Sequence, residues 1–523
     1  MKIKKIHYTS ALAVFFIFGS QAFAAEDINT TQKLETPILA GDSLSVNMDA
    51  KPKQDTSVES VADAFTQGTI KGLIRYGAQH RDSNYHTTKD STSDVAGESV
   101  QAYSALGGYL GYETAPLFYT SMGATFYTSN PLGSNPDDRK GLGGLYEKDG
   151  GQDAYNVLGE AFLKVEKDNH LVKVGRQEIP NYKFVSLSNI RMTPFTHEGA
   201  IYENSSIEGL KLNLAYITAQ KDRNDILFKG MVRSARVKTG CGAVDTSGQC
   251  MDTGSKQTIR GLYDPSNYDS SGNYAGDDKE MPMLGVSYKQ DNWNTEAWNY
   301  YVDDFVNTLY LFGQYNITLG DEWKVALAGQ YANQQDVGDS VAGNVDTWFY
   351  GLKAEASSVK GMLFFLNYNE VSYNENSYDG GTLFVRWGTP QMFNSFQVQD
   401  SELAGTKSIG VGAQFDLGAL GLLNSTVIRF RYADYDMPDE LWMTDARQDR
   451  TEATFDLRYS FTKESGFGIF TQMDGLSIQF RIAYDDFKTD YDFNAYTAIH
   501  GYNALDSVTD SFVDARIYID YVF

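Results

Sequence analysis

Short segments in which hydrophobic and polar residues alternate recur from residue 67 to the C-terminus. In 305–319, for example, Leu309 and Leu311 share one face, and Thr308 and Tyr310 share the other. Because side chains alternate between the faces of a β-strand, this period of two predicts strands with one apolar face. Eighteen such segments are found, at 67–80, 99–114, 117–129, 152–168, 169–178, 197–205, 208–220, 282–290, 293–302, 305–319, 321–335, 343–358, 360–374, 404–418, 420–435, 449–462, 474–488 and 511–523.

The connections between these segments alternate in length. The gaps at 81–98, 130–151, 179–196, 221–281, 375–403, 436–448 and 489–510 are long and those between them are short. Two departures from this rule are a tight connection near residue 303 and a longer gap at 463–473. Long loops on one rim and short turns on the other are typical of outer-membrane barrels, which close so that no backbone group is unpaired in lipid. The pattern predicts an all-β transmembrane antiparallel up-and-down barrel of about 18 strands, with long extracellular loops, short periplasmic turns and a water-filled interior.

The N-terminal region has a different pattern. Three lysines precede the apolar stretch 11–18, and Ala22-Phe23-Ala24 forms a small-x-small cleavage site. This predicts a secretory signal peptide at 1–24, with a retained membrane anchor as the alternative. The polar residues 25–66 predict a flexible N-terminal extension, for which a short plug or a periplasmic contact is the alternative. The barrel then occupies 67–523.

Composition agrees with an exported barrel. The 523 residues include 35 Tyr, 30 Phe and 48 Gly, which suit aromatic girdles and tight turns. Loss of residues 1–24 leaves 41 basic and 68 acidic residues, so no nucleic-acid partner is expected.

In an oxidising compartment, Cys241 and Cys250 in CGAVDTSGQC predict a local disulfide, with two free thiols as the alternative. Six His and two Cys offer little material for a metal or a cofactor, and neither is expected.

Arginines recur on the predicted inward faces of the last four strands. Arg429 and Arg431 lie two residues apart in IRFRYADYD and therefore share a face, and Arg458, Arg481 and Arg516 follow on the next three strands. Arginine stays charged and binds carboxylates through two hydrogen bonds. These residues predict a basic ladder that lines the pore and selects solutes. The alternative is that they only neutralise acidic residues of the lumen.

The segment GRQEIPNYKFVSLSNIRMTPFTHEGA (175–200) follows a predicted strand and contains two prolines, which indicates an ordered loop. Within it, Gly-Arg is followed by an Arg-x-x-Pro-x-Thr-x-x-Gly spacing. The residues concerned are Gly175, Arg176, Arg191, Pro194, Thr196 and Gly199.

This combination resembles the OprD-like family of Gram-negative outer-membrane porins. The resemblance implies an 18-stranded channel with a basic ladder, which Arg429 and Arg431 match here. It also implies that loop 179–196 folds into the barrel and narrows the channel. Arg176, Pro194, Thr196 and Gly199 are then expected in the constriction loop, and Arg191 among the pore-lining residues. The extension 25–66 and the long extracellular loop 221–281 depart from a compact family member, and they leave the substrate and the oligomeric state open.

Three further predicted loops are acidic. Segments 375–403 and 436–448 each carry an excess of three acidic residues, and 489–510 adds four more. An acidic mouth attracts cations and repels anions over about 8–10 Å. The alternatives are solubility and cation bridging to lipopolysaccharide.

The leading hypothesis is a passive diffusion channel for small polar or charged solutes, such as amino acids, short peptides or small carboxylates. The alternative is a non-specific general diffusion porin, possibly trimeric.

An enzyme is not expected, since His197 is the best candidate for a catalytic base and its presence is better explained by packing. An adhesin would depend on 221–281. The expected partners are outer-membrane lipid, lipopolysaccharide and small solutes, the expected location is the Gram-negative outer membrane, and the protein is expected to be a monomer or a homotrimer.

Overall fold

The computed structural model describes residues 57–87, 95–147, 151–179, 182–185, 190–235, 273–374, 376–388, 392–398, 401–437, 449–463, 473–488 and 508–523. The chain divides into two units, residues 1–37 and 38–523, and all described residues belong to the second. The predicted signal peptide and the predicted pair Cys241 and Cys250 lie outside the described residues, as does most of the predicted extension.

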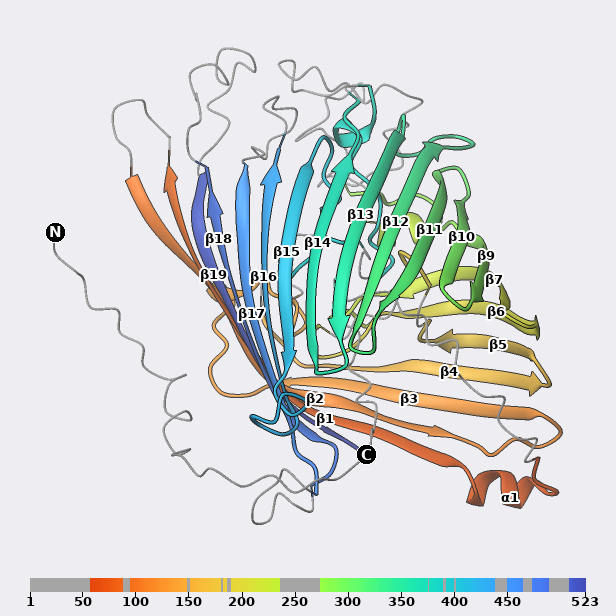
Figure 1. Ribbon diagram of the computed structural model, residues 1–523. Coiled ribbons are helices and arrows are strands. Elements are labelled where there is room, and N and C mark those ends of the chain that lie inside the picture. The colour runs from red at the N-terminus through yellow and green to blue at the C-terminus, as the bar shows by residue number, and fades with distance from the viewer. Residues whose placement is uncertain are drawn as a thin grey trace. The chain divides into compact units, whose positions relative to one another are not determined.

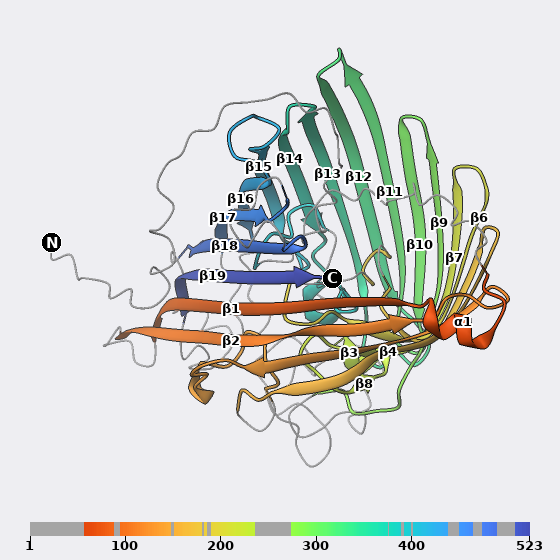
Figure 2. The same cartoon turned by 90° about the horizontal axis from the view of Figure 1, so that it is seen from below.

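The second unit contains one antiparallel sheet that closes into a barrel (Figure 1). The last long strand pairs with the first, which also pairs with the second, and Figure 2 shows these strands side by side. The eighteen long strands are β1 (Thr69–Thr87), β2 (Val95–Glu113), β3 (Thr120–Pro131), β4 (Tyr155–Lys167), β5 (His170–Gln177), β6 (Thr196–Ile207), β7 (Leu210–Lys221), β9 (Met281–Gln290), β10 (Trp293–Val302), β11 (Val306–Leu319), β12 (Trp323–Asp336), β13 (Asp346–Ser358), β14 (Met362–Val371), β15 (Lys407–Asp416), β16 (Thr426–Asp436), β17 (Arg450–Ser460), β18 (Leu476–Phe487) and β19 (Val508–Val522). A two-residue strand, β8 (Phe228–Lys229), pairs with the end of β7.

Each of the eighteen predicted segments coincides with one of these long strands, so the predicted fold class is confirmed. The largest boundary error is at β1, which ends at Thr87 rather than at residue 80, and the next is at β16, which begins at Thr426 rather than at residue 420. Residues 417–425 instead form a turn held by main-chain hydrogen bonds, and its Leu422 is 74% exposed. An apolar turn at the rim of a membrane barrel has the composition of a strand, which explains the error.

The alternation of faces follows the prediction. On β11, Leu309 and Leu311 are exposed on the outer face, and Thr308 and Tyr310 are fully buried on the inner face. The outer set of the barrel is aliphatic and aromatic, as contact with lipid requires. A functional site inside the barrel must therefore be formed by the side chains of the inner face.

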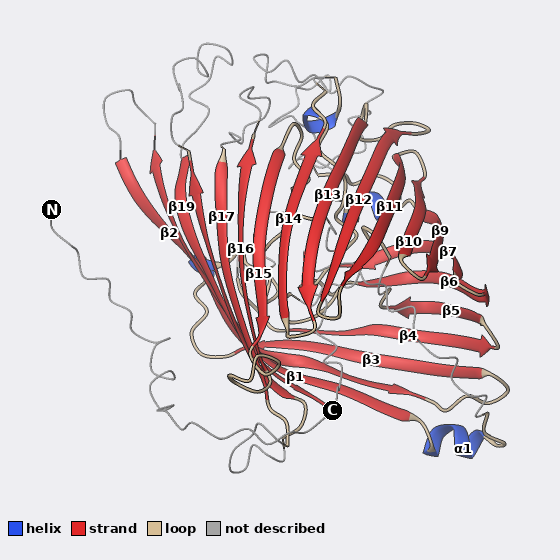
Figure 3. Ribbon diagram, viewed as in Figure 1, coloured by secondary structure: helices blue, strands red, loops and turns tan. Residues whose placement is uncertain are grey.

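The connections sort onto two rims. The turns after β2, β4, β6 and β9 are short, and the connections after β3, β5, β7 and β14 are long, with residues 303–305 as the one short exception on the long-loop rim. The helices of the described chain are short (Figure 3): α1 (Val61–Thr66), α2 (Met231–Ser234), η1 (Asp137–Arg139) and η3 (Tyr378–Gly380). Among the described residues, no helix has the length and apolar character needed to cross a membrane.

Helix α1 ends the predicted extension and is attached to the short-turn rim. Ser60 caps it by accepting a hydrogen bond from the main-chain N–H of Asp63 (3.1 Å). The N–H of Ala115, in the β2–β3 turn, donates to the carbonyl of Ala64 (2.9 Å). The chain is thus fixed to the barrel just before β1 begins.

Apolar side chains cover the inward faces of β7 and β9 to β13. The strand residues pack against loop residues that enter the barrel, which makes this part of the interior a hydrophobic core rather than a wet surface. Its members include Trp298, Tyr300, Tyr310 and Phe349 from strands, and Phe184, Met231, Phe384 and Trp387 from loops and α2. Charged inward side chains concentrate instead on β16 to β19 and on β1 to β5.

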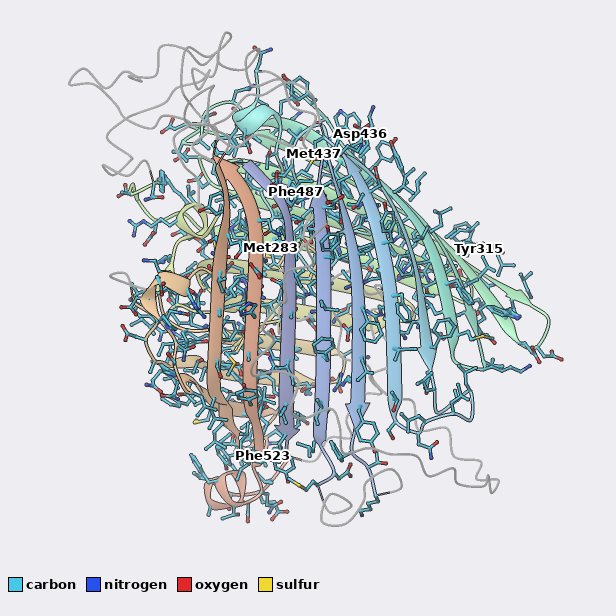
Figure 4. The ribbon with its side chains drawn as sticks, turned by 90° about the vertical axis from the view of Figure 1, so that its left-hand side faces the viewer. Met283, Tyr315, Asp436, Met437, Phe487 and Phe523 are labelled. Carbon is cyan, nitrogen blue, oxygen red and sulfur yellow. The ribbon has the colours of Figure 1, made fainter. Side chains whose placement is uncertain are left out.

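The chain ends at the closing seam of the barrel. Gly72 and Phe523 exchange two main-chain hydrogen bonds, N–H of Gly72 to O of Phe523 (2.8 Å) and N–H of Phe523 to O of Gly72 (3.0 Å). The Phe523 ring lies over Gly72, where a Cβ would be only 2.3 Å from the ring. Figure 4 places Phe523 at one end of the barrel and Asp436 and Met437 at the other.

Candidate functional site

A row of charged side chains crosses the inward face of four neighbouring strands. Arg429 of β16 is the cross-strand partner of Asp456, Asp456 of Arg481, and Arg481 of Arg516. The three arginines are 8%, 1% and 2% exposed. The row arises because successive side chains of a strand point to opposite faces. On β16, for example, Arg429 points inward and the next residue, Phe430, is exposed on the outer face. We call Arg429, Arg481 and Arg516 the arginine row.

Acidic residues neutralise part of this charge. Arg481 Nε lies 2.9 Å from Asp456 Oδ2, and Arg516 Nε lies 2.6 Å from Asp514 Oδ1. Asp514 also binds Arg81 of β1 at 2.8 Å. Such pairs offset the cost of removing charges from water. Neutralisation of lumen acids, the alternative raised by the sequence, is therefore part of what these arginines do.

The acids leave some guanidinium nitrogens without acceptors. Arg481 Nη2 and Arg516 Nη1 are buried and donate no hydrogen bond to any group in the described part of the chain. Arg481 and Arg516 are direct cross-strand partners, so these donors belong to adjacent side chains. A buried donor without an acceptor costs free energy that a bound anion would recover.

The other two predicted ladder residues lie beside the row. Arg431, two residues along β16, donates from Nε to Thr454 Oγ1 (3.1 Å), and its guanidinium lies 4.8 Å from the centre of the Phe396 ring. Arg458 of β17 is the partner of Gln479, one step nearer the short-turn rim. All five predicted arginines are thus on the inward face, and three of them share one row.

The loop between β5 and β6 lies against this same wall. Its Ile190 carbonyl accepts a hydrogen bond from the Tyr518 hydroxyl (2.8 Å), and its Arg191 carbonyl accepts one from Arg75 Nη1 (2.6 Å). Met192 packs in a small apolar cluster with Tyr103 of β2. The loop therefore crosses the interior from β5 to the wall formed by β19, β1 and β2.

Arg191 is brought close to the arginine row by these contacts. Burial lowers the pKa of its guanidinium, and the positive charge of Arg516 lowers it further. A cation held beside other cations raises the local positive potential. Arg191 thus lies beside the arginines of the row.

The glycines of the sequence motif have a structural role. Gly175 of β5 and Gly199 of β6 are cross-strand partners. A Cβ at Gly175 would lie 2.2 Å from the carbonyl oxygen of Ala161, and one at Gly199 would lie 2.2 Å from that of Tyr216. Only glycine allows the neighbouring strands to approach this closely where the loop leaves the wall.

The remaining motif residues do not all reach the lumen. Arg176 shares the outer face of β5 with the exposed Val174 and forms an ion pair with Glu198 (3.0 Å), so it lies away from the arginine row. The Pro194 carbonyl accepts a hydrogen bond from the buried Lys221 Nζ (3.2 Å), and Thr196 is buried at the start of β6.

His197, considered as a candidate base, is buried beside Thr196 and donates from Nε2 to the Trp387 carbonyl (3.0 Å). This contact links the β5–β6 loop region to the connection between β14 and β15. The imidazole thus serves in packing, as the sequence analysis favoured.

The long connection between β14 and β15 also enters the barrel, which the sequence analysis did not foresee. Arg516 Nη2 donates to the Gln397 carbonyl (3.0 Å), and Gln397 Nε2 donates to Asp514 Oδ1 (3.0 Å). The N–H groups of Gln397 and Val398 donate to Glu452 (2.7 and 3.1 Å). The segment 392–398 therefore contacts the arginine row at Arg516.

The sequence contained a signal that the β14–β15 connection enters the barrel. Segment 383–396 contains Leu, Val, Trp, Met and three Phe, which is too apolar for a loop in water. Glu402, which the sequence analysis assigned to an acidic mouth, is 6% exposed and forms an ion pair with Arg386 (3.2 Å). In predicting where the β14–β15 connection lies, its many apolar residues were better evidence than its excess of acidic residues.

A second charged group lies at the start of the β5–β6 loop. The Tyr127 hydroxyl contacts Glu178 (2.6 Å) and Glu160 (3.1 Å), and Lys71 binds Glu160 at 2.7 Å. Burial raises the pKa of the Glu178 carboxyl, and the negative charge of Glu160 adds to the rise. The described residues contain no group of three or more His, Cys, Asp or Glu side chains placed to hold a metal ion.

Comparison with known proteins places these features in a family context. The model of the family described as "outer membrane porin, OprD family" matches residues 124–492. No curated protein matches the sequence.

Solved structures resemble the fold. Pseudomonas aeruginosa OccK9 (OpdG) has a TM-score of 0.64 at 17% identity, covering 88% of this chain and 99% of its own. Acinetobacter baumannii OccAB3 has a TM-score of 0.63 at 17% identity, covering 87% of this chain and 99% of its own. P. aeruginosa OpdK with vanillate has a TM-score of 0.60 at 15% identity, covering 88% of this chain and 99% of its own.

Proposed function

The chain belongs to the OprD family of outer membrane porins, and we propose that it is a selective diffusion channel for small solutes that carry a carboxylate. Location in the Gram-negative outer membrane follows from the family. Solute selection is assigned to the arginine row together with Arg431, Arg458 and Arg191. The β5–β6 loop and segment 392–398 narrow the path beside these arginines.

The observation that carries this proposal is the pair of adjacent guanidinium groups, Arg481 and Arg516, whose Nη2 and Nη1 atoms donate to no acceptor among the described residues. A carboxylate has two oxygens that accept such hydrogen bonds, and arginine presents matching donors. Binding of this kind is useful in a channel only if it is weak enough to release the solute.

Segment 392–398 makes the binding weak and selective. The Gln397 carbonyl already accepts a hydrogen bond from Arg516 (3.0 Å), so a carboxylate must displace this main-chain group to engage the side chain fully. Exchange of one acceptor for another lowers the net free energy gained. The similar structure of OpdK is described with vanillate, itself a carboxylate, which supports this solute class.

Planar-bilayer recordings of the refolded protein test the proposal. Arg429→Gln removes one charge of the row, and the Arg429 side chain donates to the neutral Gln414. Its cross-strand neighbour Asp456 keeps the ion pair with Arg481 in this variant. The anion-to-cation permeability ratio should fall by about two- to fivefold, as loss of ~0.5–1 kcal/mol of charge interaction predicts.

The matched control is Arg176→Gln, which removes an arginine from the outer face. It should leave the reversal potential unchanged. Equal behaviour of the two variants, with no block of the current by a carboxylate, would favour a non-specific general diffusion porin instead.

A further inference from the structure

Helix α1 is held on the outer face of the barrel at its short-turn rim. Tyr112 of β2 lies on the same face as the exposed Leu110, because the two are separated by one residue. The Tyr112 hydroxyl donates a hydrogen bond to the carbonyl of Phe65 in α1. A Cβ at Gly68 would lie 2.2 Å from that hydroxyl oxygen, so glycine makes room for this contact. The helix, which Figure 2 shows at the start of β1, therefore adjoins the surface that faces lipid.

Two large apolar side chains of α1 are exposed. Val61 is 63% exposed and Phe65 is 54% exposed, and their separation of four residues places them on one face of the helix. Ala64, by contrast, is buried. A helix of six residues is too short to be stable alone, so α1 depends on what it contacts.

The neighbouring β2–β3 turn adds a third apolar side chain. Phe118, in this turn, is 77% exposed, and its N–H donates to Ser57 Oγ (2.9 Å). The N–H of Val58 donates to the Pro116 carbonyl (2.9 Å), so the turn and the segment that leads into α1 are joined. Exposed apolar residues are common singly, but these form one connected group. We call Val61, Phe65 and Phe118 the apolar rim cluster.

The backbone of the β2–β3 turn is unusual for the residues it contains. Phe118 and Tyr119 have φ values of 50° and 66°, and Leu117 and Thr120 close the turn with two main-chain hydrogen bonds. Turns with positive φ at both central residues favour Asn, Asp and Gly, because bulky side chains are strained there. The short turns after β4, β6, β9, β11 and β13 follow this rule, with Asp168, Gly209, Asp291, Gly320 and Gly361 as their positive-φ residues. An aromatic pair in this conformation indicates that the side chains serve a purpose other than turn formation.

The surroundings of the turn have the composition of a membrane–water interface. Lys167, an exposed residue at the end of β4, lies with its Nζ 4.9 Å from the centre of the Tyr119 ring. Aromatic rings are enriched at the level of lipid headgroups, and a lysine beside them can extend its ammonium group to a phosphate. The apolar rim cluster thus lies next to a cation that suits a phospholipid headgroup.

We propose that α1 and the β2–β3 turn form an interfacial membrane anchor, with the apolar rim cluster inserted among the acyl chains of phospholipids at the short-turn side of the outer membrane. The cluster continues the lipid-facing surface of the strands, where Ile70, Leu110 and Met122 are 62%, 57% and 51% exposed. Helix α1 lies in the plane of the interface and does not cross it. The anchor fixes the end of the predicted N-terminal extension outside the barrel, and it is independent of how the channel selects solutes.

Spin labels on the full chain in phospholipid vesicles test this. Cys241→Ser and Cys250→Ser first remove the native thiols, and Phe65→Cys, Phe118→Cys or Asp291→Cys then provides one site for a nitroxide. Asp291 is the matched control, because it is an exposed residue with positive φ in another turn of the same rim. Collision with oxygen, relative to collision with a water-soluble nickel chelate, should be about tenfold more frequent at positions 65 and 118 than at 291, because oxygen partitions into acyl chains.

Amide hydrogen exchange gives a second readout that needs no label. Phe65→Ser combined with Phe118→Ser should speed exchange across 61–67 by about tenfold in vesicles, since α1 loses its lipid contacts, and should leave the strands unchanged. Asp291→Ser should have no such effect. The proposal is overturned if labels at 65, 118 and 291 behave alike, or if the paired serine variant keeps the original exchange rate. Labels at 65 and 118 that are shielded from both reagents would also overturn it, and would show that a protein or a second copy of the chain covers the cluster.

Discussion

Individual charges inside this barrel have one of two kinds of partner. Arg516 and Arg481 each have a carboxylate within ion-pair distance, whereas Glu178 lies beside a second carboxyl, Glu160, at the Tyr127 hydroxyl. Glu160 itself is also the ion-pair partner of Lys71. In the first arrangement, the attraction between the two opposite charges offsets part of the cost of removing them from water. The second places two acids so close that ionisation of one disfavours ionisation of the other.

Glu178 should therefore make the β5–β6 loop sensitive to pH. Its folded-state pKa is raised by burial and by Glu160, so the docked loop holds the proton more tightly than the released loop does. The resulting stabilisation is complete below about pH 4.5 and is lost as pH rises through the raised pKa. Open-channel current noise should increase as pH rises above about 4.5, through the raised pKa of Glu178.

Glu178→Gln should abolish this pH dependence, because the amide keeps an acceptor for the Tyr127 hydroxyl and cannot ionise. The matched control is Glu166→Gln, an exposed position on β4 that should retain the pH dependence of the unsubstituted protein. A noise profile that is identical in all three proteins would contradict the role assigned to Glu178.

The alternation of side chains along a strand predicted well which face a single residue occupies, provided that the strand continues on both sides of that residue. Arg429 and Arg481 lie inward, as predicted, because their neighbours Phe430 and Phe480 mark the outer face. Arg176 was assigned to the constriction through its position in a family motif. Its own strand gave the better evidence, because Val172 and Val174 already marked that face as the outer one.

At the scale of elements, strands were predictable and the inward fold of loops was not. A strand carries its own periodicity, whereas a loop turns inward because of contacts with distant residues. Gln397 meets Arg516, and His197 meets Trp387, across separations of 119 and 190 residues. The β5–β6 loop was expected to fold inward only through a family resemblance, and the β14–β15 connection had no such aid.

The closing seam should be sensitive to added volume on its outer face. Gly72→Val would place a Cβ about 2.3 Å from the Phe523 ring and force that ring away from the β1–β19 junction. Overpacking of this kind costs about 1–3 kcal/mol. In refolded protein, the temperature at which the folded band is lost in detergent gels should fall.

Gly313→Val is the control for this change, because a Cβ at Gly313 on β11 meets no atom within 4 Å. It should leave the transition temperature unchanged, since valine is a good strand former. Phe523→Ala should relieve the defect of Gly72→Val in part, because it removes the ring that the new side chain displaces. An equal loss of stability in Gly72→Val and Gly313→Val would show that the seam contact is not the cause.

At the scale of the whole molecule, the net negative charge of the chain and the arginines of the lumen wall act over different distances. The sequence has a formal net charge of −24, with acidic excess in the long connections 436–448 and 489–510. The arginine row is enclosed by strands and by segment 392–398. Salt screens exposed charges strongly and enclosed charges weakly.

Ion selectivity should therefore change with salt concentration. At about 0.03 M salt the field of the acidic exterior extends beyond 10 Å and favours cations, whereas at about 1 M it extends only about 3 Å. The enclosed arginines keep their local effect at both concentrations. The reversal potential in a fixed salt gradient should thus move toward anion selectivity as the mean concentration rises. Arg429→Gln should reduce the anion preference mainly at high salt, where exterior charges no longer contribute, and a salt-independent reversal potential would contradict this division of charge.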